Sequence, residues 1–408
     1  ERPADHRGHQ VTLTVVPNSN AQPGQRTRMP LRSNVRRFDP WLVVPALLLS
    51  VVGAALIYSA TKGKLLSAGD DPRSFLDKQL INIVVGLVLA WIVGSLGYRT
   101  LRAAAWWVYL GVVGLLALVL SPLGTTMNGI QAWIMMPAGF SIQPSELAKV
   151  AIILAVSLVL TQLGPSGAAE SDIKPRLRVV LVAIVVAGVP MALILLQPDL
   201  GTVLVIAATV LGMLAVAGTA SWVLWGLIAA AAASAFAIIR FSVLEKYQVD
   251  RLLIFMNPNA DPLGAGYNTR MARLAISGGG VAGQGLFSGP TTQGGFVPYQ
   301  QTDFVFSVAG EELGLLGAGA IIILIGIILW RGTKIALGAP DRYGRVMAAG
   351  VVVWFAVQAF ENIGMNLGIM PVTGVPLPFV SYGGSSMFAL WIGIGLLCSV
   401  HARSRRLS

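Results

Sequence analysis

An acidic side chain, Asp261, lies near the start of a long polar loop, residues 241–303, that separates two apolar segments. Its neighbours Pro262 and Gly264 favour a tight turn, so Asp261 is consistent with a simple turn former. A carboxylate in such a loop can also act as a general base, because it can accept a proton from a substrate hydroxyl within hydrogen-bond reach. Long ordered loops are uncommon without a function, so we expect chemistry here, at the membrane surface.

Further ionisable residues lie inside or at the ends of apolar segments, where burying a charge is costly and function is the default interpretation. They are Glu146, Lys149, Asp199, Asp303, Glu311, Glu312 and Glu361. Most of them also have a structural interpretation. Glu146 and Lys149 stand three residues apart, as paired neighbours on a helix do, and Asp199 can cap the helix that follows it. Glu311 and Glu312 can pair with Lys149 or with an arginine of the outer loop.

Membrane-spanning helices are the elements that must position these side chains. The chain has 408 residues, of which 55% are hydrophobic and 12% charged, and its mean hydropathy is +0.72. An apolar run of about 20 residues spans a bilayer as a helix. We predict an all-α integral membrane protein with one large extracytoplasmic loop, 241–303, between the seventh and eighth of ten spans. These spans lie near 41–60, 79–97, 104–122, 144–163, 178–196, 201–218, 221–240, 304–331, 344–366 and 377–400.

The residues outside the spans are too few to form a second domain. Residues 1–38 are polar and have no hydrophobic period, so we expect a disordered cytoplasmic tail. The membrane domain then covers 39–402, and 403–408 form a short second tail. The one cysteine, Cys398, and the three histidines, which lie outside the predicted spans, predict neither a disulfide framework nor a thiolate or imidazole metal site.

The net charge of +11 reflects membrane orientation rather than nucleic-acid binding. Nineteen lysines and arginines lie in the predicted inner segments and nine in the outer segments when both termini are cytoplasmic. This excess follows the positive-inside rule. In this orientation the ionisable residues of the spans all fall in the outer half of the membrane. The sequence therefore predicts a polar site that opens outward, under the large loop.

Several motifs resemble the SEDS family (shape, elongation, division and sporulation) of ten-span membrane glycosyltransferases. They occur in the family's order between residues 41 and 400. They are Asn128-Gly129-x-x-x-Trp133, Gln143-Pro144-Ser145-Glu146-Leu147-Ala148-Lys149, Gln197-Pro198-Asp199-Leu200-Gly201, Asp261-Pro262-Leu263-Gly264-x-Gly266-Tyr267, Thr302-Asp303-Phe304, Gly310-Glu311-Glu312-Leu313-Gly314 and Pro376-Leu377-Pro378-Phe379-Val380-Ser381-Tyr382-Gly383-Gly384-Ser385-Ser386. A further segment, Asn362-Ile363-Gly364-Met365-Asn366, resembles the elongation branch of the family, RodA.

The resemblance implies a peptidoglycan glycosyltransferase of the bacterial plasma membrane, which polymerises lipid II into glycan strands for cell-wall elongation. It implies that Asp261 is the general base and that Trp133, Glu146 and Lys149 line the outward cavity. It also implies a partner, a class B penicillin-binding protein with transpeptidase activity. A single base opposite the leaving group implies inversion at C1 of the donor sugar.

Positive charge must balance the pyrophosphate of the leaving group in such a reaction. Many SEDS members carry arginines where this chain has Ala132 and Ser141. The charge would then come from side chains or from a bound Mg²⁺ or Mn²⁺ held by phosphate and carboxylate oxygens. Besides Trp133 and Glu146, the substrate-binding candidates are Lys149, Arg251, Arg270, Arg273, Asp303 and Glu312.

Two other functions are consistent with the sequence. A lipid II flippase would need a polar path through the full depth of the membrane, whereas the ionisable side chains here lie only in its outer half. A groove lined by serine, threonine and asparagine would still allow such a transporter. A non-catalytic scaffold for a transpeptidase would leave the acidic residues and the long loop without a purpose.

Overall fold

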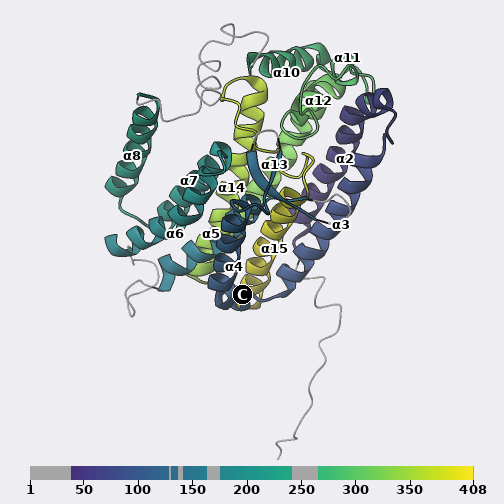
Figure 1. Cartoon of the computed structure of the whole chain (residues 1–408). Coiled ribbons are helices and arrows are strands. Elements are labelled where there is room, and N and C mark those ends of the chain that lie inside the picture. Colours follow the sequence, from purple (N-terminus) through teal and green to yellow (C-terminus); the bar gives the residue numbers. More distant parts are fainter. Residues whose placement is uncertain (1–37, 128–129, 137–140, 163–174, 241–264, 408) are drawn as a thin grey trace, which may run out of the picture.

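The computed structural model describes residues 38–127, 130–136, 141–162, 175–240 and 265–407 (Figure 1). Its helices are α2 (Pro40–Ala68), α3 (Ser74–Ser95), α4 (Tyr98–Val119), α5 (Pro144–Gln162), α6 (Leu177–Leu195), α7 (Leu200–Val216), α8 (Ser221–Arg240), α10 (Ala265–Gly279), α11 (Pro290–Gln293), α12 (Val305–Glu312), α13 (Gly314–Leu337), α14 (Arg342–Leu367) and α15 (Gly384–Leu407). A small antiparallel sheet, not predicted from the sequence, lies between α4 and α5. Its strands are β1 (Thr125–Met127), β2 (Ile130–Met135) and β3 (Ser141–Ile142).

Eight helices in the described part of the chain are long and apolar enough to cross a membrane, namely α2, α3, α4, α5, α6, α13, α14 and α15. Two further apolar helices, α7 and the first part of α8, are shorter. A helix satisfies its own backbone hydrogen bonds, which is why apolar sequence in a bilayer adopts this form. The predicted all-α membrane class is confirmed, and the count of ten crossings stays a prediction. The last helix continues to Leu407, so residues 403–407 extend it.

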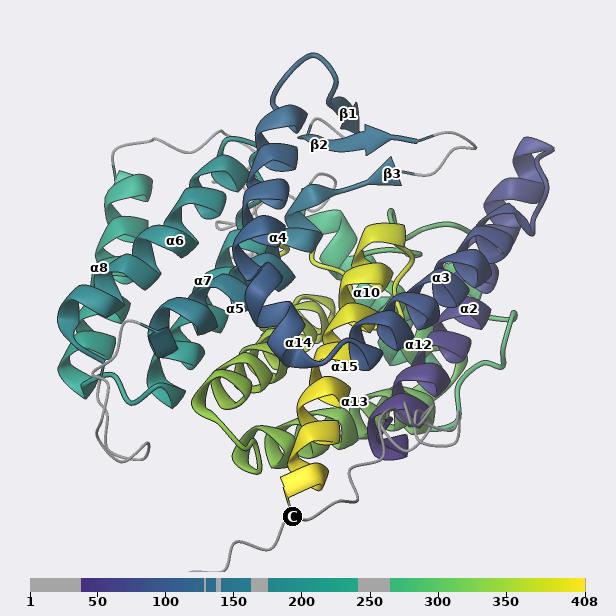
Figure 2. The ribbon, with the colours of Figure 1, turned by 90° about the horizontal axis from the view of Figure 1, so that it is seen from below.

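The bundle is built around α5, which is buried from Pro144 to Leu160 except at Leu147. It contacts α4, α6, α7, α14 and α15, whereas α8 lies at the edge of the bundle, away from α2 and α3 (Figure 2). The most extensive helix contact joins α3 to α15. Small residues allow it, because a Cβ at Gly86 would lie 2.5 Å from the Trp391 ring.

The predicted eighth span, 304–331, is not one helix, and this expectation was wrong. The chain forms α12 and then α13, which meet at Gly314, whose φ is +66°. Such a break exposes backbone groups that cost free energy when buried. The glycine-rich turn 280–285 satisfies them. Its carbonyls at Gly280 and Val281 accept from the first amides of α13, and its own amides donate to the carbonyls of Glu311 and Glu312.

Two helices of the polar loop, α10 and α11, gather with α12 at the end of the bundle opposite the C-terminus (Figure 1). The glycine-rich segment Ser277–Gly279 forms the end of α10. A Cβ at Gly279 would lie 1.9 Å from the carbonyl oxygen of Gly310, so glycine is needed for close packing on α12. The described part of the loop, from α10 onward, therefore packs on the ends of the membrane helices.

An ionic cluster lies at the other end of the bundle, where α2 begins and α15 ends. Asp39 caps α2 by accepting from the Trp41 amide at 3.0 Å. Its Oδ2 also lies 2.6 Å from Nη2 of Arg331 and 3.6 Å from Nε2 of His401. These contacts join the beginning of α2 to the ends of α13 and α15.

Candidate functional site

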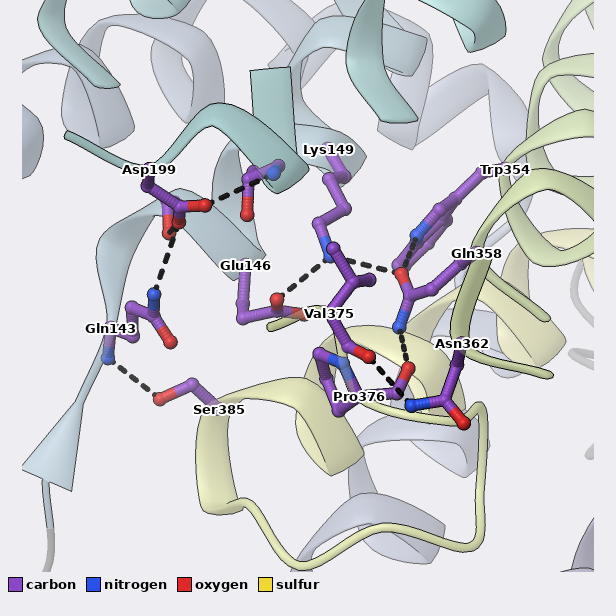
Figure 3. A network of polar contacts seen from close by, with 12 residues as sticks. Gln143, Glu146, Lys149, Asp199, Trp354, Gln358, Asn362, Val375, Pro376 and Ser385 are labelled. Carbon is purple, nitrogen blue, oxygen red and sulfur yellow. Dashed lines mark hydrogen bonds and ion pairs between the residues drawn. The ribbon is translucent and has the colours of Figure 1, made fainter. Parts of the chain in front are cut away.

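Glu146 and Lys149 form an ion pair in the first two turns of α5. Nζ of Lys149 lies 2.7 Å from Oε1 of Glu146, and each residue is only 2% exposed. Nζ also donates to Oε1 of Gln358 on α14 at 2.9 Å (Figure 3). A charge buried this deeply is costly unless it is paired and hydrogen-bonded, and both conditions hold for Lys149.

Gln358 fixes the side of the pair that faces α14. Its Oε1 accepts from Nε1 of Trp354 at 2.6 Å, and its Nε2 donates to the carbonyl oxygen of Pro376 at 2.9 Å. The Trp354 ring centre lies 5.6 Å from Nζ of Lys149, within cation–π range. The orientation of the Gln358 amide is therefore set by partners on both of its ends (Figure 3).

Asp199 lies on the other side of the pair and caps α7, as predicted. Its Oδ1 accepts from the Thr202 amide at 3.0 Å. Its Oδ2 accepts from Nε2 of Gln143 at 3.3 Å and from Oγ of Ser145 at 3.4 Å, which precede Glu146 by three residues and by one. The carboxylate thus ties the beginning of α7 to the beginning of α5 (Figure 3).

Asp303, at the end of the polar loop, meets α14 through its backbone. Its carbonyl oxygen accepts from Nδ2 of Asn362 at 2.9 Å and from Nδ2 of Asn366 at 3.1 Å. Residues 369–383, which connect α14 to α15, are called the strap below. A Cβ at Gly374 of the strap would lie 3.5 Å from Oδ2 of Asp303, so the carboxylate faces the strap.

Glu311 and Glu312 form a separate cluster with α2 and α11, and within the described residues neither of them pairs with Lys149 or with an arginine. Glu311 accepts from the amides of Thr291 and Thr292 at 2.7 and 2.8 Å. Glu312 accepts from Oγ of Ser59 at 2.5 Å and from Nε2 of Gln293 at 3.4 Å. Their partners here are backbone amides and neutral side chains of α2, α11 and its flanks, which pack against α12. These contacts hold α11 to α12.

The remaining candidates are spread over the outer surface. Trp133 is half-buried on β2, where its carbonyl accepts from Oγ1 of Thr125 at 3.2 Å. Arg270 and Arg273 are exposed on α10. Nη2 of Arg273 donates to the carbonyl oxygen of Gly368 at 2.9 Å, at the C-terminus of α14. Two further candidates, Asp261 and Arg251, lie outside the described residues.

No group of three or more His, Cys, Asp or Glu side chains that could hold a metal ion occurs in the part of the chain that the structure describes. Side chains that lie there do not by themselves fit a Mg²⁺ or Mn²⁺ site. The chemistry below therefore has no step through a metal ion.

Neutral polar residues are the part of the site that the sequence analysis missed. Trp354, Gln358 and Asn362 all face the pair, the strap or Asp303, and Glu361 is 1% exposed on the same helix. The signal was present in the sequence, because polar residues at 358, 362 and 366 recur at helical spacing inside an apolar span. Only charged residues of the spans were predicted as site residues, so these neutral ones were not included.

The comparisons with known proteins agree on one family. The FtsW/RodA/SpoVE family, described as "Cell cycle protein", matches residues 40–406. Peptidoglycan glycosyltransferase MrdB of Escherichia coli (strain K12) is 35% identical over 91% of this chain and 95% of its own length. Stage V sporulation protein E of Bacillus subtilis (strain 168) is 37% identical over 90% of this chain and 98% of its own.

A solved structure of similar fold is described as "Structural coordination of polymerization and crosslinking by a peptidoglycan synthase complex". Its matching chain has a TM-score of 0.74 and 32% sequence identity, and the match covers 90% of this chain and 98% of that one. By sequence and by fold, the chain belongs to the FtsW/RodA/SpoVE family, which is the SEDS family.

Proposed function

We propose that this protein polymerises lipid II into glycan strands, with Asp261 as the general base and inversion at C1 of the donor sugar. Its relatives over nearly the whole chain make it a peptidoglycan glycosyltransferase. The observation that carries the finer proposal is the buried Lys149, which is held by Glu146 and by Gln358 of α14. The same helix binds the end of the polar loop, because Asn362 donates to the carbonyl oxygen of Asp303.

The reaction needs a base and positive charge. The C4 hydroxyl of one sugar attacks C1 of another, which leaves with its lipid pyrophosphate. A sugar hydroxyl is a weak nucleophile at neutral pH, so a carboxylate must accept its proton as the new bond forms. The leaving pyrophosphate already carries charge and needs no general acid, but cations stabilise the charge that develops on it.

The described residues can supply that charge. Lys149 is the cation of the buried pair, and exposed Arg270 and Arg273 project from α10, which begins four residues after Asp261. The Arg273 guanidinium has further donors besides the one that meets Gly368. In this proposal the arginines of α10 take the role of the cations that other family members carry where Ala132 and Ser141 stand. Trp133, Glu146, Arg251, Asp303 and Glu312 remain substrate-binding candidates.

The proposal extends to location and partner. The apolar helices make the chain a membrane protein, and we place it in the bacterial plasma membrane with both termini in the cytoplasm. The similar solved chain belongs to a complex that coordinates polymerization and crosslinking. We propose a crosslinking partner of the same kind here, a class B penicillin-binding protein. A divalent ion carried in with the substrate phosphates would add to the positive charge.

The test is glycan-strand formation from lipid II by purified protein, comparing wild type with Asp261→Asn. Asparagine keeps the turn but cannot accept the proton, so we expect kcat to fall on the order of 10²–10⁴-fold. Asp70→Asn, an acid in the loop between α2 and α3, is the matched control and should keep full activity. A near wild-type rate for Asp261→Asn would show that Asp261 is only a turn former.

A further inference from the structure

Three amide side chains form a row along one face of α14. Gln358, Asn362 and Asn366 are spaced four residues apart, which places them one above the other on a helix, and each is 0% exposed. We call this row the amide ladder. A buried amide costs free energy unless its donors and acceptors are paired. Within α14, Nδ2 of Asn366 donates to the carbonyl oxygen of Asn362, and Oε1 of Gln358 accepts from Trp354. The other partners of the ladder lie outside its own helix, in two parts of the site.

Gln358, the first residue of the amide ladder, binds the cation Lys149. Oε1 of Gln358 accepts from Nζ of Lys149 at 2.9 Å, while its Nε2 donates to Pro376 in the strap at 2.9 Å. If the Gln358 amide were flipped, its NH₂ group would face the Lys149 ammonium group and its oxygen would face the carbonyl oxygen of Pro376. Only one orientation therefore satisfies all the partners, and this orientation directs Lys149.

Asn362 and Asn366, the other two residues of the amide ladder, bind the end of the polar loop. Asn362 donates to the carbonyls of Asp303 and Val375 at 2.9 and 2.8 Å. Asn366 donates to the same Asp303 carbonyl at 3.1 Å, and its Oδ1 accepts from the Ser307 amide at 3.1 Å. Two amides therefore converge on one carbonyl oxygen and use both of its lone pairs.

The residues just before Asp303 are fixed in the same way by the far end of the strap. The carbonyl oxygen of Gln301 accepts from the Tyr382 amide at 2.9 Å, and that of Thr302 accepts from Oγ of Ser381 at 2.5 Å. Three successive carbonyls of the loop are thus bound by groups from α14 and the strap. These hydrogen bonds fix the position of the backbone at Asp303 relative to α14.

We propose that the amide ladder positions Lys149 and Asp303 relative to one another for glycosyl transfer, so that Gln358, Asn362 and Asn366 are positioning residues. This inference rests on the proposed function. Gln358, which binds Lys149, and Asn362, the nearer of the two asparagines on Asp303, are four residues apart, about 6 Å along the helix at 1.5 Å per residue. In this proposal Lys149 and Asp303 contact different groups of the substrates, the leaving pyrophosphate and the acceptor sugar.

A purely structural role for the ladder makes a different prediction. If the amides only satisfied buried carbonyls, removing one would lower stability, and its effect on catalysis would add to that of a change at Asp303. If the ladder positions Asp303, removing Asn362 already releases the carboxylate. A second change at Asp303 then costs little more. Non-additivity separates the two roles.

The experiment is a double-mutant cycle with Asn362→Leu and Asp303→Asn, measured as kcat and KM for lipid II. Asn82→Leu, which removes a buried asparagine on α3 outside the ladder, is the matched control. We expect Asn362→Leu to lower kcat on the order of 10²-fold, with KM changed less than about threefold. Adding Asp303→Asn to it should lower kcat by no more than about twofold further. In the Asn82→Leu background, Asp303→Asn should have its full effect.

A second readout does not depend on activity. Hydrogen exchange of the amides at 301–307 should accelerate in Asn362→Leu and stay at the wild-type rate in Asn82→Leu. Asn362→Ser serves in the same cycle if the leucine variant does not fold. The positioning role of the amide ladder would be overturned if Asn362→Leu left hydrogen exchange at 301–307 or kcat unchanged. It would also be overturned if the effects of Asn362→Leu and Asp303→Asn on kcat were additive. A wild-type protein that forms no glycan from lipid II, while exchange responds as expected, would instead overturn the proposed function.

Discussion

Nζ of Lys149 donates to Oε1 of Gln358 across 2.9 Å and joins α5 to α14 where both side chains are buried. The contact binds the most buried helix of the bundle to the helix that carries the strap. Lys149 is therefore not a simple intrahelical partner of Glu146. Its position depends on a second helix, and through that helix on the end of the polar loop.

This arrangement predicts the outcome of exchanging the charges of the pair. Lys149→Met should destabilise the protein by roughly 3–5 kcal/mol, because Glu146 is left buried without its partner. Exchanging both residues, Glu146→Lys with Lys149→Glu, should restore most of the folded protein but not lipid II polymerisation. The cation then lies one turn away from Gln358. Full recovery of activity by the exchanged pair would remove Lys149 from substrate binding.

The turn 280–285, which packs against the break between α12 and α13, predicts a difference between two glycines. Gly283 (φ +83°) and Gly285 (φ +97°) both have backbone conformations that favour glycine. A Cβ at Gly283 would lie 2.2 Å from the carbonyl oxygen of Glu312, whereas at Gly285 nothing lies closer than 3.8 Å. Gly285→Ala should therefore cost only the backbone strain, about 1–2 kcal/mol, and Gly283→Ala clearly more.

Thermal unfolding can be followed for both alanine variants with a thiol-reactive dye. Cys398, the only cysteine of the chain, is 0% exposed and reacts when the bundle opens. Equal melting temperatures for the two variants would contradict the packing of this turn against α12.

Tyr299, four residues before Asp303, has a φ of +55°, which is unfavourable for an aromatic residue. Its carbonyl accepts from the amides of Thr302, Asp303 and Phe304, which hold it in place. Asparagine tolerates this conformation, and β-branched residues do not. Tyr299→Asn should raise the melting temperature, while Tyr299→Val should lower it, with about 1–2 kcal/mol between them. The reverse order would mean that the tyrosine side chain stabilises the turn.

The orientation in the membrane is testable with single cysteines in a Cys398→Ser background. Ser288→Cys lies in the exposed part of the polar loop, and Ser19→Cys lies in the N-terminal segment. A membrane-impermeant thiol reagent should label intact cells only through Ser288→Cys, as the nineteen-to-nine distribution of lysine and arginine requires. Labelling through Ser19→Cys instead would reverse the orientation and exclude an outward-facing site.

The sequence was sufficient for the helices but not for their interruptions. Apolar length predicts helices because the bilayer leaves few alternatives, and the cap at Asp199 follows from a local rule. The break at Gly314 was not predicted, because the backbone groups that stabilise it, at Gly280 and Val281, lie some thirty residues away in the chain.

The same limit applies to the site. The spacing of Glu146 and Lys149 predicts a pair, since the two residues share a helix face. Nothing local indicates that Gln358 receives the lysine or that the Asp303 carbonyl receives two asparagines. Such partners depend on tertiary packing. Ser59 likewise became a partner of Glu312 only because α2 lies beside α12.

The contact between α3 and α15 has a consequence for how the protein is made. Ribosomes deliver α3 to the membrane early and α15 last, so the α3 surface around Gln79, Asn82 and Gly86 has no partner during most of synthesis. Gln79 and Asn82 are buried in the finished bundle, and until then their amides would face lipid or an insertion factor. Truncated nascent chains that lack α15 should therefore be the ones that membrane quality-control proteases recognise.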